Sequence, residues 1–359
     1  MKVALVYDRL NKWGGAERVL IALHKIFPDA PLYTSVYSPE NASFAKDFQV
    51  RTSFLQKYKF LRDHNEMLAL FMPMAFESFN FDEFDLVISV TSESAKGIIT
   101  KPHTVHLCYC LTPTRYLWSG YDEYFRGKFM KFISTPALMY LKRWDKLASS
   151  RPDFYIAIST EVSKRIKKYY GKESEIIFPP IMLKDFKLKN TKQQNFYLLV
   201  SRMSRSTHYK KVDLAIEAFN KTGLPLKIIG TGPLENKLKR KSGKNIEFLG
   251  KLTDERLAYY YESCKALIFP GLEDFGLVMA EAQFFGKPII AYRGGGARDI
   301  VEDKKTGILF KEQTVESLIS ALKRFSESDY NKPDIKFSAQ RFTFDKFKLS
   351  LEKQIESRI

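Results

Sequence analysis

Two glutamates, Glu273 and Glu281, stand eight positions apart in a stretch that could hold a polar ligand. The apolar run before Glu273 reads as a buried strand, and a helix pattern begins near Gly276. Glu273 would then lie at the carboxyl edge of a sheet, and Glu281 could face the same crevice. The first N–H groups of a helix lack intrahelical partners, so those of Phe275, Gly276 and Leu277 would favour an anionic or hydroxyl-rich ligand.

Two glycine-rich turns offer further room for a ligand. The apolar run Pro288–Tyr292 leads into Gly294-Gly295-Gly296, whose missing side chains would let a ligand approach the backbone closely. Gly14 and Gly15 lie between the first apolar run and the first helix pattern, where doubly wound α/β folds receive anionic ligands. Glycines in such turns also occur for purely steric reasons.

Short apolar runs alternate with helix patterns in two series, which argues for mostly parallel sheets covered on both faces. The first series is Lys2–Tyr7, Leu32–Val36, Leu86–Val90, Val105–Tyr109 and Tyr155–Ile158. The second is Phe196–Val200, Leu226–Ile229, Ile246–Leu249, Ala266–Phe269, Pro288–Ala291 and Gly307–Phe310. Helices are expected at Gly15–Phe27, Val212–Asn220, Glu255–Ser263 and Thr343–Ile359. The chain has 359 residues, enough for two domains, and Pro179-Pro180 opens the linker between them.

The net charge, the apolar runs and the cysteine content limit which classes of protein fit this sequence. The net charge is +17, which suggests an anionic partner such as a membrane surface, nucleic acid or phosphorylated substrate. No apolar run reaches the roughly 18–20 residues of a membrane span, and the amino terminus shows no signal peptide pattern. The 3 cysteines are too few for a disulfide framework and lack metal-ligand spacing. We therefore expect a cytoplasmic protein.

Six runs of sequence, in the right order, resemble the retaining nucleotide-sugar glycosyltransferases of family four, and most closely the bacterial subgroup of O-antigen mannosyltransferases. They are VYDRLNKWGGAERVL, CYCLTPTRYLW, KRWDKLASSRPDFYIAIS, IIFPP, YKKVDLAIEAF and PGLEDFGLVMAEAQFFGKPIIAYRGGGARDIV. The resemblance implies the GT-B fold, an α/β fold of two Rossmann-like domains with a deep cleft between them. It implies an acceptor-binding domain in residues 1–183, a nucleotide-sugar domain in residues 184–342, and a helix at 343–359 that packs back on the first domain.

The resemblance also assigns the donor site. Glu273 would hold sugar hydroxyls, with Asp274, Phe275, Gly276 and Leu277 beside it, and Glu281 would hold the ribose; without this context Glu273 could be a plain turn residue and Glu281 a solvated helix carboxylate. Arg202 and Lys210 resemble the pair that grips the diphosphate. The loop Met203–Tyr209 looks longer than in relatives, so Lys211 could replace Lys210, and a basic surface loop is the other reading. Near the nucleotide the expected residues are Gly230, Gly232, Lys251 and Leu252, although both glycines could be steric.

The acceptor side is expected in the first domain. The residues assigned to it are Asp8, Gly14, Gly15, Glu17, Thr112 and Arg115, with Glu17 equally explicable as a first-turn carboxylate. Leu111 stands where many relatives carry a histidine that borders the reacting sugar, which puts a side-chain role there in doubt. His103 and His106 are close by, and a surface or core position suits each better.

The resemblance implies transfer with retention. The acceptor hydroxyl would attack from the face on which the diphosphate leaves, so no flanking carboxylate pair is needed. The sequence has no Asp-x-Asp motif, so we expect no metal and no other cofactor, with Glu273, Arg202 and Lys210 as the catalytic residues. The expected reaction moves a hexose, mannose from GDP-mannose first, onto a glycan or polyprenyl-linked acceptor in surface polysaccharide assembly.

Other functions can be weighed beside this one. A UDP-sugar-dependent transferase of the same family would move glucose, galactose or an N-acetylhexosamine. A sugar-nucleotide 2-epimerase would need no acceptor, and a phosphorylase would need a pyridoxal phosphate lysine, for which no convincing site is found. A non-enzymatic basic protein that binds membrane or nucleic acid would explain the charge but not the Glu273 and Glu281 arrangement; we expect no nucleic acid partner.

An amphipathic helix with basic flanks is expected around Pro136. Its apolar positions recur every three or four residues: Phe129, Phe132, Ile133, Ala137, Tyr140, Leu141 and Trp144. This face either packs on the domain core or lies in a membrane interface, held by anionic headgroups. The apolar segment Phe54–Phe79 is a second candidate, and both suit peripheral attachment to the inner face of the membrane.

Overall fold

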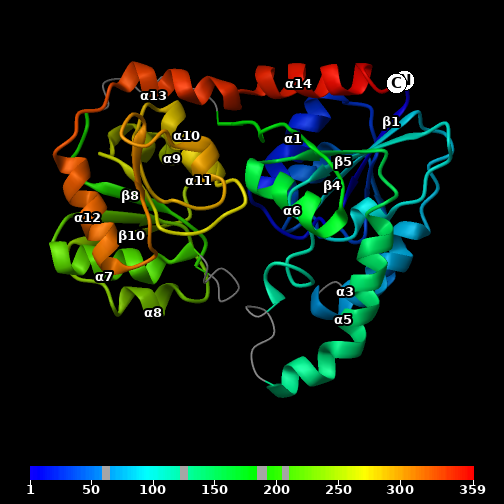
Figure 1. The fold of residues 1–359 in the computed structure, drawn as a ribbon, viewed down its shortest axis with the longest axis horizontal. Coiled ribbons are helices and arrows are strands. Elements are labelled where there is room, and N and C mark those ends of the chain that lie inside the picture. Colours follow the sequence, from blue (N-terminus) through cyan, green and yellow to red (C-terminus); the bar gives the residue numbers. More distant parts are fainter. Residues whose placement is uncertain (59–64, 122–127, 184–191, 204–209) are drawn as a thin grey trace. The chain divides into compact units, whose positions relative to one another are not determined.

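The computed structural model describes residues 1–58, 65–121, 128–183, 192–203 and 210–359. The chain divides into two compact units, each with its own sheet flanked by helices (Figure 1). The first unit holds Met1–Pro179 and Lys348–Ile359, and the second holds Pro180–Phe347. Within the first unit, the Arg358 guanidinium lies over the Phe154 ring, 5.3 Å from its centroid.

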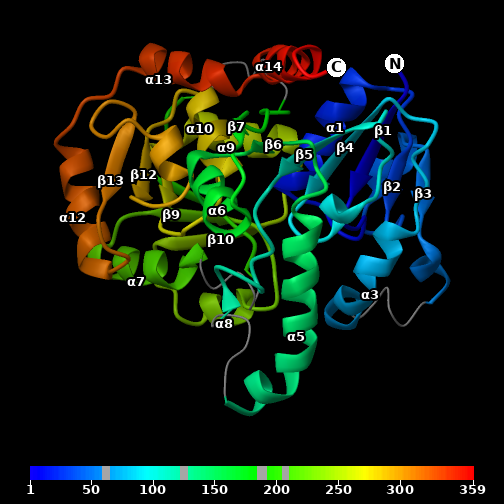
Figure 2. The same ribbon diagram turned by 45° about the vertical axis from the view of Figure 1, so that its right-hand side comes forward.

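The first unit is built on a parallel sheet of seven strands. Their order is β3 (Val50–Thr52), β2 (Leu32–Thr34), β1 (Val3–Tyr7), β4 (Leu86–Thr91), β5 (Val105–Cys110), β6 (Phe154–Ala157) and β7 (Glu175–Ile176). All of β1 and β4 is buried without alternation, as expected for strands covered on both faces. Figure 2 shows the strands of this sheet side by side, from β3 to β7. In the register of these two strands Tyr7 lies opposite Val90, so both end at the same edge.

The described part of the first unit also contains α-helices. They are α1 (Gly15–Ile26), α3 (Asn65–Glu77), α5 (Lys128–Ala148) and α6 (Thr160–Tyr170). The Ser159 hydroxyl accepts a hydrogen bond from the N–H of Val162 at the start of α6, and Gly171 ends that helix with φ 70°.

The second unit has a parallel sheet of six strands. Their order is β10 (Ile246–Gly250), β9 (Leu226–Ile229), β8 (Tyr197–Val200), β11 (Leu267–Phe269), β12 (Ile289–Tyr292) and β13 (Gly307–Phe310). Its helices are α7 (Val212–Thr222), α8 (Glu235–Lys239), α9 (Asp254–Ser263), α10 (Leu277–Phe284), α11 (Ala297–Ile300), α12 (Val315–Ser326) and α13 (Lys332–Ala339), and α14 (Phe344–Glu356) begins in this unit.

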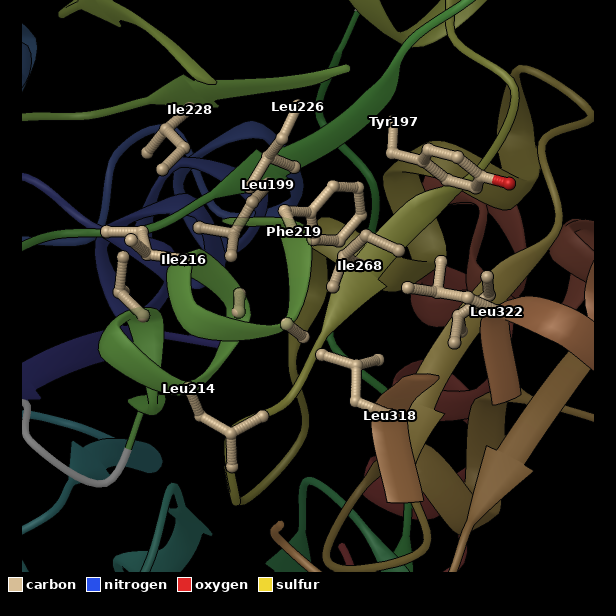
Figure 3. Close-up of a cluster of buried hydrophobic side chains, with 14 of the residues drawn as sticks. Tyr197, Leu199, Leu214, Ile216, Phe219, Leu226, Ile228, Ile268, Leu318 and Leu322 are labelled. Carbon is tan, nitrogen blue, oxygen red and sulfur yellow. The ribbon is translucent and has the colours of Figure 1, made fainter. Parts of the chain in front are cut away.

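The core of the second unit lies between one face of this sheet and two helices. Figure 3 shows side chains of β8, β9 and β11 meeting those of α7 and α12. Phe219 at 0% exposure is at its centre, and its ring lies edge-on to Tyr197 with centroids 5.5 Å apart. The expectation of two Rossmann-like α/β domains is confirmed. Strands β3 and β7, of three and two residues, are the ones that the sequence reading missed.

Candidate functional site

The candidate site lies where the strand order of the second sheet reverses. The chain starts this sheet at β8, adds β9 and β10 on one side, and then places β11, β12 and β13 on the other. The loops after β8 and β11 therefore separate at one edge, the place where open α/β sheets bind ligands. Arg202 lies on the first of these loops, and Glu273 lies on the second.

Two residues of the predicted site form an ion pair. Lys210 Nζ lies 2.5 Å from Glu273 Oε1, with side chains 16% and 21% exposed. Lys211 does not take part: it precedes α7 in a left-handed conformation, with φ 52°. It lines a separate hollow of about 440 Å³ between α7 and the start of α12. Of the two lysines left open by the sequence, Lys210 is the one beside Glu273. Residues 204–209, where a longer loop was expected, lie outside the described part of the chain.

Glycines hold the Arg202 loop in place. A Cβ on Gly230 would lie 2.0 Å from the carbonyl oxygen of Ser201, and one on Gly232 would lie 2.3 Å from that of Met203. Met203 N–H also donates to the Thr231 carbonyl at 3.0 Å. Both glycines are therefore required for steric reasons, because they admit the strand-end loop that carries Arg202.

The Gly294-Gly295-Gly296 run serves the Glu273 loop in the same way. A Cβ on Gly295 would lie 2.0 Å from the Glu273 carbonyl oxygen, and one on Gly296 would lie 2.1 Å from that of Phe275. Gly296 N–H donates to the Glu273 carbonyl at 3.0 Å. We expected a ligand to approach this run. The protein's own loop fills that space instead, and it fixes the Glu273 backbone.

Glu281 is buried, so its reading as a solvated helix carboxylate is wrong. It is 2% exposed in α10, and its Oε2 accepts a hydrogen bond from the Tyr261 hydroxyl at 2.9 Å. Tyr261 itself is fully buried in α9 and stacks on Phe285, with ring centroids 5.7 Å apart. Tyr261 could not be recognised from the sequence, because a tyrosine in an amphipathic helix is indistinguishable from a core residue.

The remaining donor-side residues lie around the same sheet edge. Gly276 precedes α10 with φ 87°, and in the described part of the chain neither its N–H nor that of Leu277 has an acceptor. The Phe275 side chain points into the core and meets Phe342 edge-on, with centroids 5.5 Å apart. Asp274 is half-buried.

Lys251 and Leu252 lie farther along this edge. They follow β10, which is separated from β8 by β9, and Lys251 is exposed. Gly250, just before them, has φ 69°, and its carbonyl accepts the Gly230 N–H at 2.8 Å. That bond ties the turn after β10 to the turn after β9.

The corresponding reversal in the first sheet lies between β1 and β4, and there Asp8 points into the protein. Its Oδ1 accepts from the Thr91 hydroxyl at 2.9 Å and the N–H of Ala95 at 2.8 Å. Its Oδ2 accepts the N–H of Ser92 at 2.7 Å and that of Glu93 at 3.1 Å. Asp8 holds this loop, which corrects its assignment to an acceptor surface.

Glu17 is also turned inward. It is 1% exposed and accepts a hydrogen bond from the Tyr7 hydroxyl at 2.7 Å. Burial, with the Glu17 charge beside it, raises the pKa of Tyr7 well above its usual range. By contrast Gly15 is exposed, and a Cβ there would meet nothing within 4 Å. At this helix start Gly15 therefore has open space around it, while Gly14 is half-buried.

A buried polar network holds the loop that carries Thr112 and Arg115. Lys96 Nζ lies 2.5 Å from Asp145 Oδ1, with side chains 1% and 2% exposed. Asp145 further accepts from the Thr114 hydroxyl at 2.8 Å, Trp118 Nε1 at 2.8 Å and the Tyr170 hydroxyl at 2.9 Å. The sequence reading had no signal for this network, whose members come from four separate segments.

Thr112 and Arg115 differ in how far they reach the surface. Thr112 is 6% exposed and lies 3.5 Å from Arg165 Nη1, whereas Arg115 is half-buried. Leu111 is a buried apolar residue.

Both nearby histidines have structural surroundings, as expected. His106 is fully buried, with Nε2 2.8 Å from the Ser89 hydroxyl, and burial lowers its pKa to about 3. His103 is exposed, with Nε2 3.1 Å from the Asp82 carbonyl oxygen. In the residues that the structure covers, no group of His, Cys, Asp and Glu is arranged to hold a metal ion.

Comparison with known proteins places the candidate site within one family match. Residues 182–340 match the family described as Glycosyl transferases group 1. An O-antigen chain mannosyltransferase C of Escherichia coli is 26% identical over 54% of this chain and 54% of its own length. An alpha-1,3/1,6-mannosyltransferase of Dictyostelium discoideum is 23% identical over 97% of this chain and 94% of its own length. The chain spans about half the length, or less, of the first curated relatives.

Solved structures show the fold. HepE of Anabaena, in complex with UDP-glucose, superposes with a TM-score of 0.71 at 17% identity, covering 99% of this chain and 100% of its own. Likeness at this identity establishes architecture alone, and that architecture is GT-B.

Proposed function

We propose that this chain is a glycosyltransferase that moves a hexose from a nucleotide sugar onto a glycan or lipid-linked acceptor. The observation that carries the proposal is the contact of Lys210 with Glu273 at the strand-order reversal of the second sheet. A cation suited to a diphosphate and a carboxylate suited to sugar hydroxyls lie side by side there. The region that matches the glycosyltransferase family contains both residues.

The donor we favour is GDP-mannose. Two relatives are named mannosyltransferases, which supports mannose. The solved relative with bound UDP-glucose supports a UDP-sugar as the second candidate. Glu281, held by Tyr261, would accept hydrogen bonds from the ribose, which both nucleotides share.

In the proposed reaction the bond between the anomeric carbon and a diphosphate oxygen breaks. A bond forms to the acceptor hydroxyl on the same face, and the hydroxyl proton passes to the leaving diphosphate. Lys210 and Arg202 would meet the negative charge that grows on that diphosphate. We propose that the transfer proceeds with retention and without a metal ion.

Nucleotide release tests the proposal. Purified protein is incubated with GDP-mannose and with UDP-glucose, UDP-galactose and UDP-N-acetylglucosamine, each with and without EDTA, and the released diphosphate is measured. We expect release with one donor, unaffected by EDTA, and lost in Glu273→Ala and Arg202→Ala. Lys221→Met, which removes an exposed surface cation of α7, is the matched control. The site is wrong if the Glu273 and Arg202 variants turn over as the unmodified protein does.

The same assay separates the alternative classes. When the sugar products are analysed as well, a 2-epimerase would give an epimerised sugar without acceptor, whereas a transferase would release the unchanged sugar by slow hydrolysis and form a glycoside when acceptor is added. A non-enzymatic basic protein would release no nucleotide from any donor.

We further propose that the first unit binds to an anionic membrane surface. Helices α3 and α5 lie side by side (Figure 1) through Ala69, Leu138 and Leu141. Their outer faces expose large apolar side chains, namely Leu70, Phe71, Met74, Met139 and Tyr140. Lys142, Arg143 and Lys146 of α5 are exposed and would meet lipid phosphates. The side chains of Phe129, Phe132 and Ile133 lie outside the described part of the chain.

Liposome flotation tests this surface. We expect binding to vesicles with anionic lipid and much weaker binding to neutral ones, and loss of binding in Phe71→Glu/Met74→Glu. Leu349→Glu, which adds a charge at an exposed leucine of α14, is the control. Equal absence of binding to both lipids would rule the surface out. In the described helices, none is long and apolar enough to cross a bilayer.

A further inference from the structure

The ion pair in the candidate site joins two groups that the proposed reaction needs separately. Lys210 Nζ lies 2.5 Å from Glu273 Oε1, while the reaction requires Lys210 at a diphosphate and Glu273 at sugar hydroxyls. An ammonium group has three N–H donors, and a carboxylate and a phosphate compete for them as acceptors. Lys210 therefore cannot interact fully with the carboxylate and the phosphate at the same time.

The Glu273 main chain cannot withdraw from this contact. Its carbonyl oxygen accepts a hydrogen bond from the Gly296 N–H at 3.0 Å. The same oxygen would lie only 2.0 Å from a Cβ on Gly295, so the two loops are in close contact. The backbone of Glu273 is therefore fixed, and only rotation of its side chain can move the carboxylate away from Lys210. A diphosphate bound at Lys210 then lies beside the Glu273 carboxylate. This carboxylate lowers the affinity of the protein for the diphosphate by charge repulsion and by competition for the Lys210 ammonium.

From this geometry we propose that Glu273 is an internal competitor for the diphosphate at Lys210. The inference rests on the proposed function and deepens it. With an intact nucleotide sugar, the sugar hydroxyls donate hydrogen bonds to Glu273 and draw it from Lys210. After transfer the product lacks those hydroxyls. Glu273 then returns to Lys210 and weakens the hold on the nucleoside diphosphate. One carboxylate thus favours the donor over the product.

Removing the charge of Glu273 should therefore strengthen product binding while it weakens catalysis. Glu273→Gln keeps the shape and a carbonyl acceptor but does not compete for a cation. For a partly exposed pair we expect GDP or UDP to bind about two- to tenfold more tightly to this variant. A residue that only held the sugar would leave the affinity for GDP and UDP unchanged.

Calorimetric titration of GDP and UDP into four proteins tests the inference: the unmodified chain, Glu273→Gln, Lys210→Met and the double variant. We expect the tightening to appear in Glu273→Gln and to vanish when Lys210 is already methionine. Asp274→Asn removes a charge from the same loop and controls for the general field; its effect should be smaller. A Glu273→Gln variant that binds no more tightly overturns the inference, and so does tightening that persists in the double variant. If the unmodified chain binds neither GDP nor UDP, the proposed function itself falls.

Discussion

The Asp8 carboxylate and the N–H of Ala95 lie 2.8 Å apart, although 87 positions separate them in the sequence. The contact spans the strand-order reversal of the first sheet, where backbone N–H groups would otherwise suit an anionic ligand. The protein's own carboxylate occupies them. In the second sheet the corresponding edge carries the Lys210 and Glu273 pair, so the two sheets use the same edge for different purposes.

Asp8→Asn should destabilise the first unit. The amide replaces one acceptor oxygen by a donor that faces backbone N–H groups, so we expect a loss of about 2–4 kcal/mol in the free energy of unfolding. The 3 tryptophans, Trp13, Trp118 and Trp144, all belong to this unit, so urea unfolding followed by their fluorescence reports on it alone. Asp29→Asn, at an exposed position, is the control. Equal midpoints for both variants would contradict the role of Asp8.

The stability of the first unit should fall in mild acid because of His106. Burial lowers the pKa of this imidazole to about 3, whereas in the unfolded chain it would be about 6.5. Between these values the unfolded state binds the extra proton, so the contribution is present above the unfolded pKa and is lost as the pH falls. Relative to His106→Gln, the native chain should lose about 2 kcal/mol between pH 7 and pH 5. Tryptophan-monitored unfolding at both values measures this, and parallel profiles would refute it.

Two glycine-to-alanine changes should differ in their effect on the second unit. Gly230→Ala puts a Cβ 2.0 Å from the Ser201 carbonyl at φ 128°, so the Arg202 loop has to move. Gly250→Ala meets nothing within 4 Å and carries only the strain of φ 69°. We expect the free energy of unfolding to fall by about 1 kcal/mol in Gly250→Ala and by at least about 3 kcal/mol in Gly230→Ala. Hydrogen exchange of residues 196–203 should rise in the Gly230 variant only.

Lys210 and Lys211 are adjacent but should not be equivalent. Lys210→Met removes the cation beside Glu273 and should lower turnover by about 100-fold, the scale of losing one preorganised charge. Lys211→Met changes a side chain in the hollow beside α12 and should stay within a few-fold of the original rate. Steady-state nucleotide release measures both. A larger loss for Lys211→Met would reverse the assignment.

Gly15→Ala should separate folding from acceptor use. The position is exposed at the start of α1 and has room for a methyl group, so stability should be unchanged or higher by up to about 1 kcal/mol. If the acceptor approaches this turn, transfer to acceptor should fall while slow donor hydrolysis continues. Unchanged transfer would place the acceptor elsewhere.

Much of the fold could be predicted because apolar runs and turn residues are local signals. The run Phe196–Val200 becomes β8 within one residue, and the helix expected at Val212–Asn220 is α7. Strands β3 and β7 are partly exposed, and their sequences lack the continuous apolar run that identifies a central strand. Edge strands are set by the neighbour they pair with, which a single sequence does not display.

The two α/β halves and the residue types at the edge of the second sheet follow from the order of residues alone, because periodicity and turn residues are local features of the chain. The partners that those residues face depend on how the folded elements pack. Asp8 and Glu17 were expected on the acceptor side, yet both are buried against partners from packed elements. Gly295 and Gly296, where a ligand was expected to approach, instead admit the neighbouring Glu273 loop. Side-chain direction and close backbone contact depend on distant segments, and the pairing of Lys210 with Glu273 is one outcome of that packing.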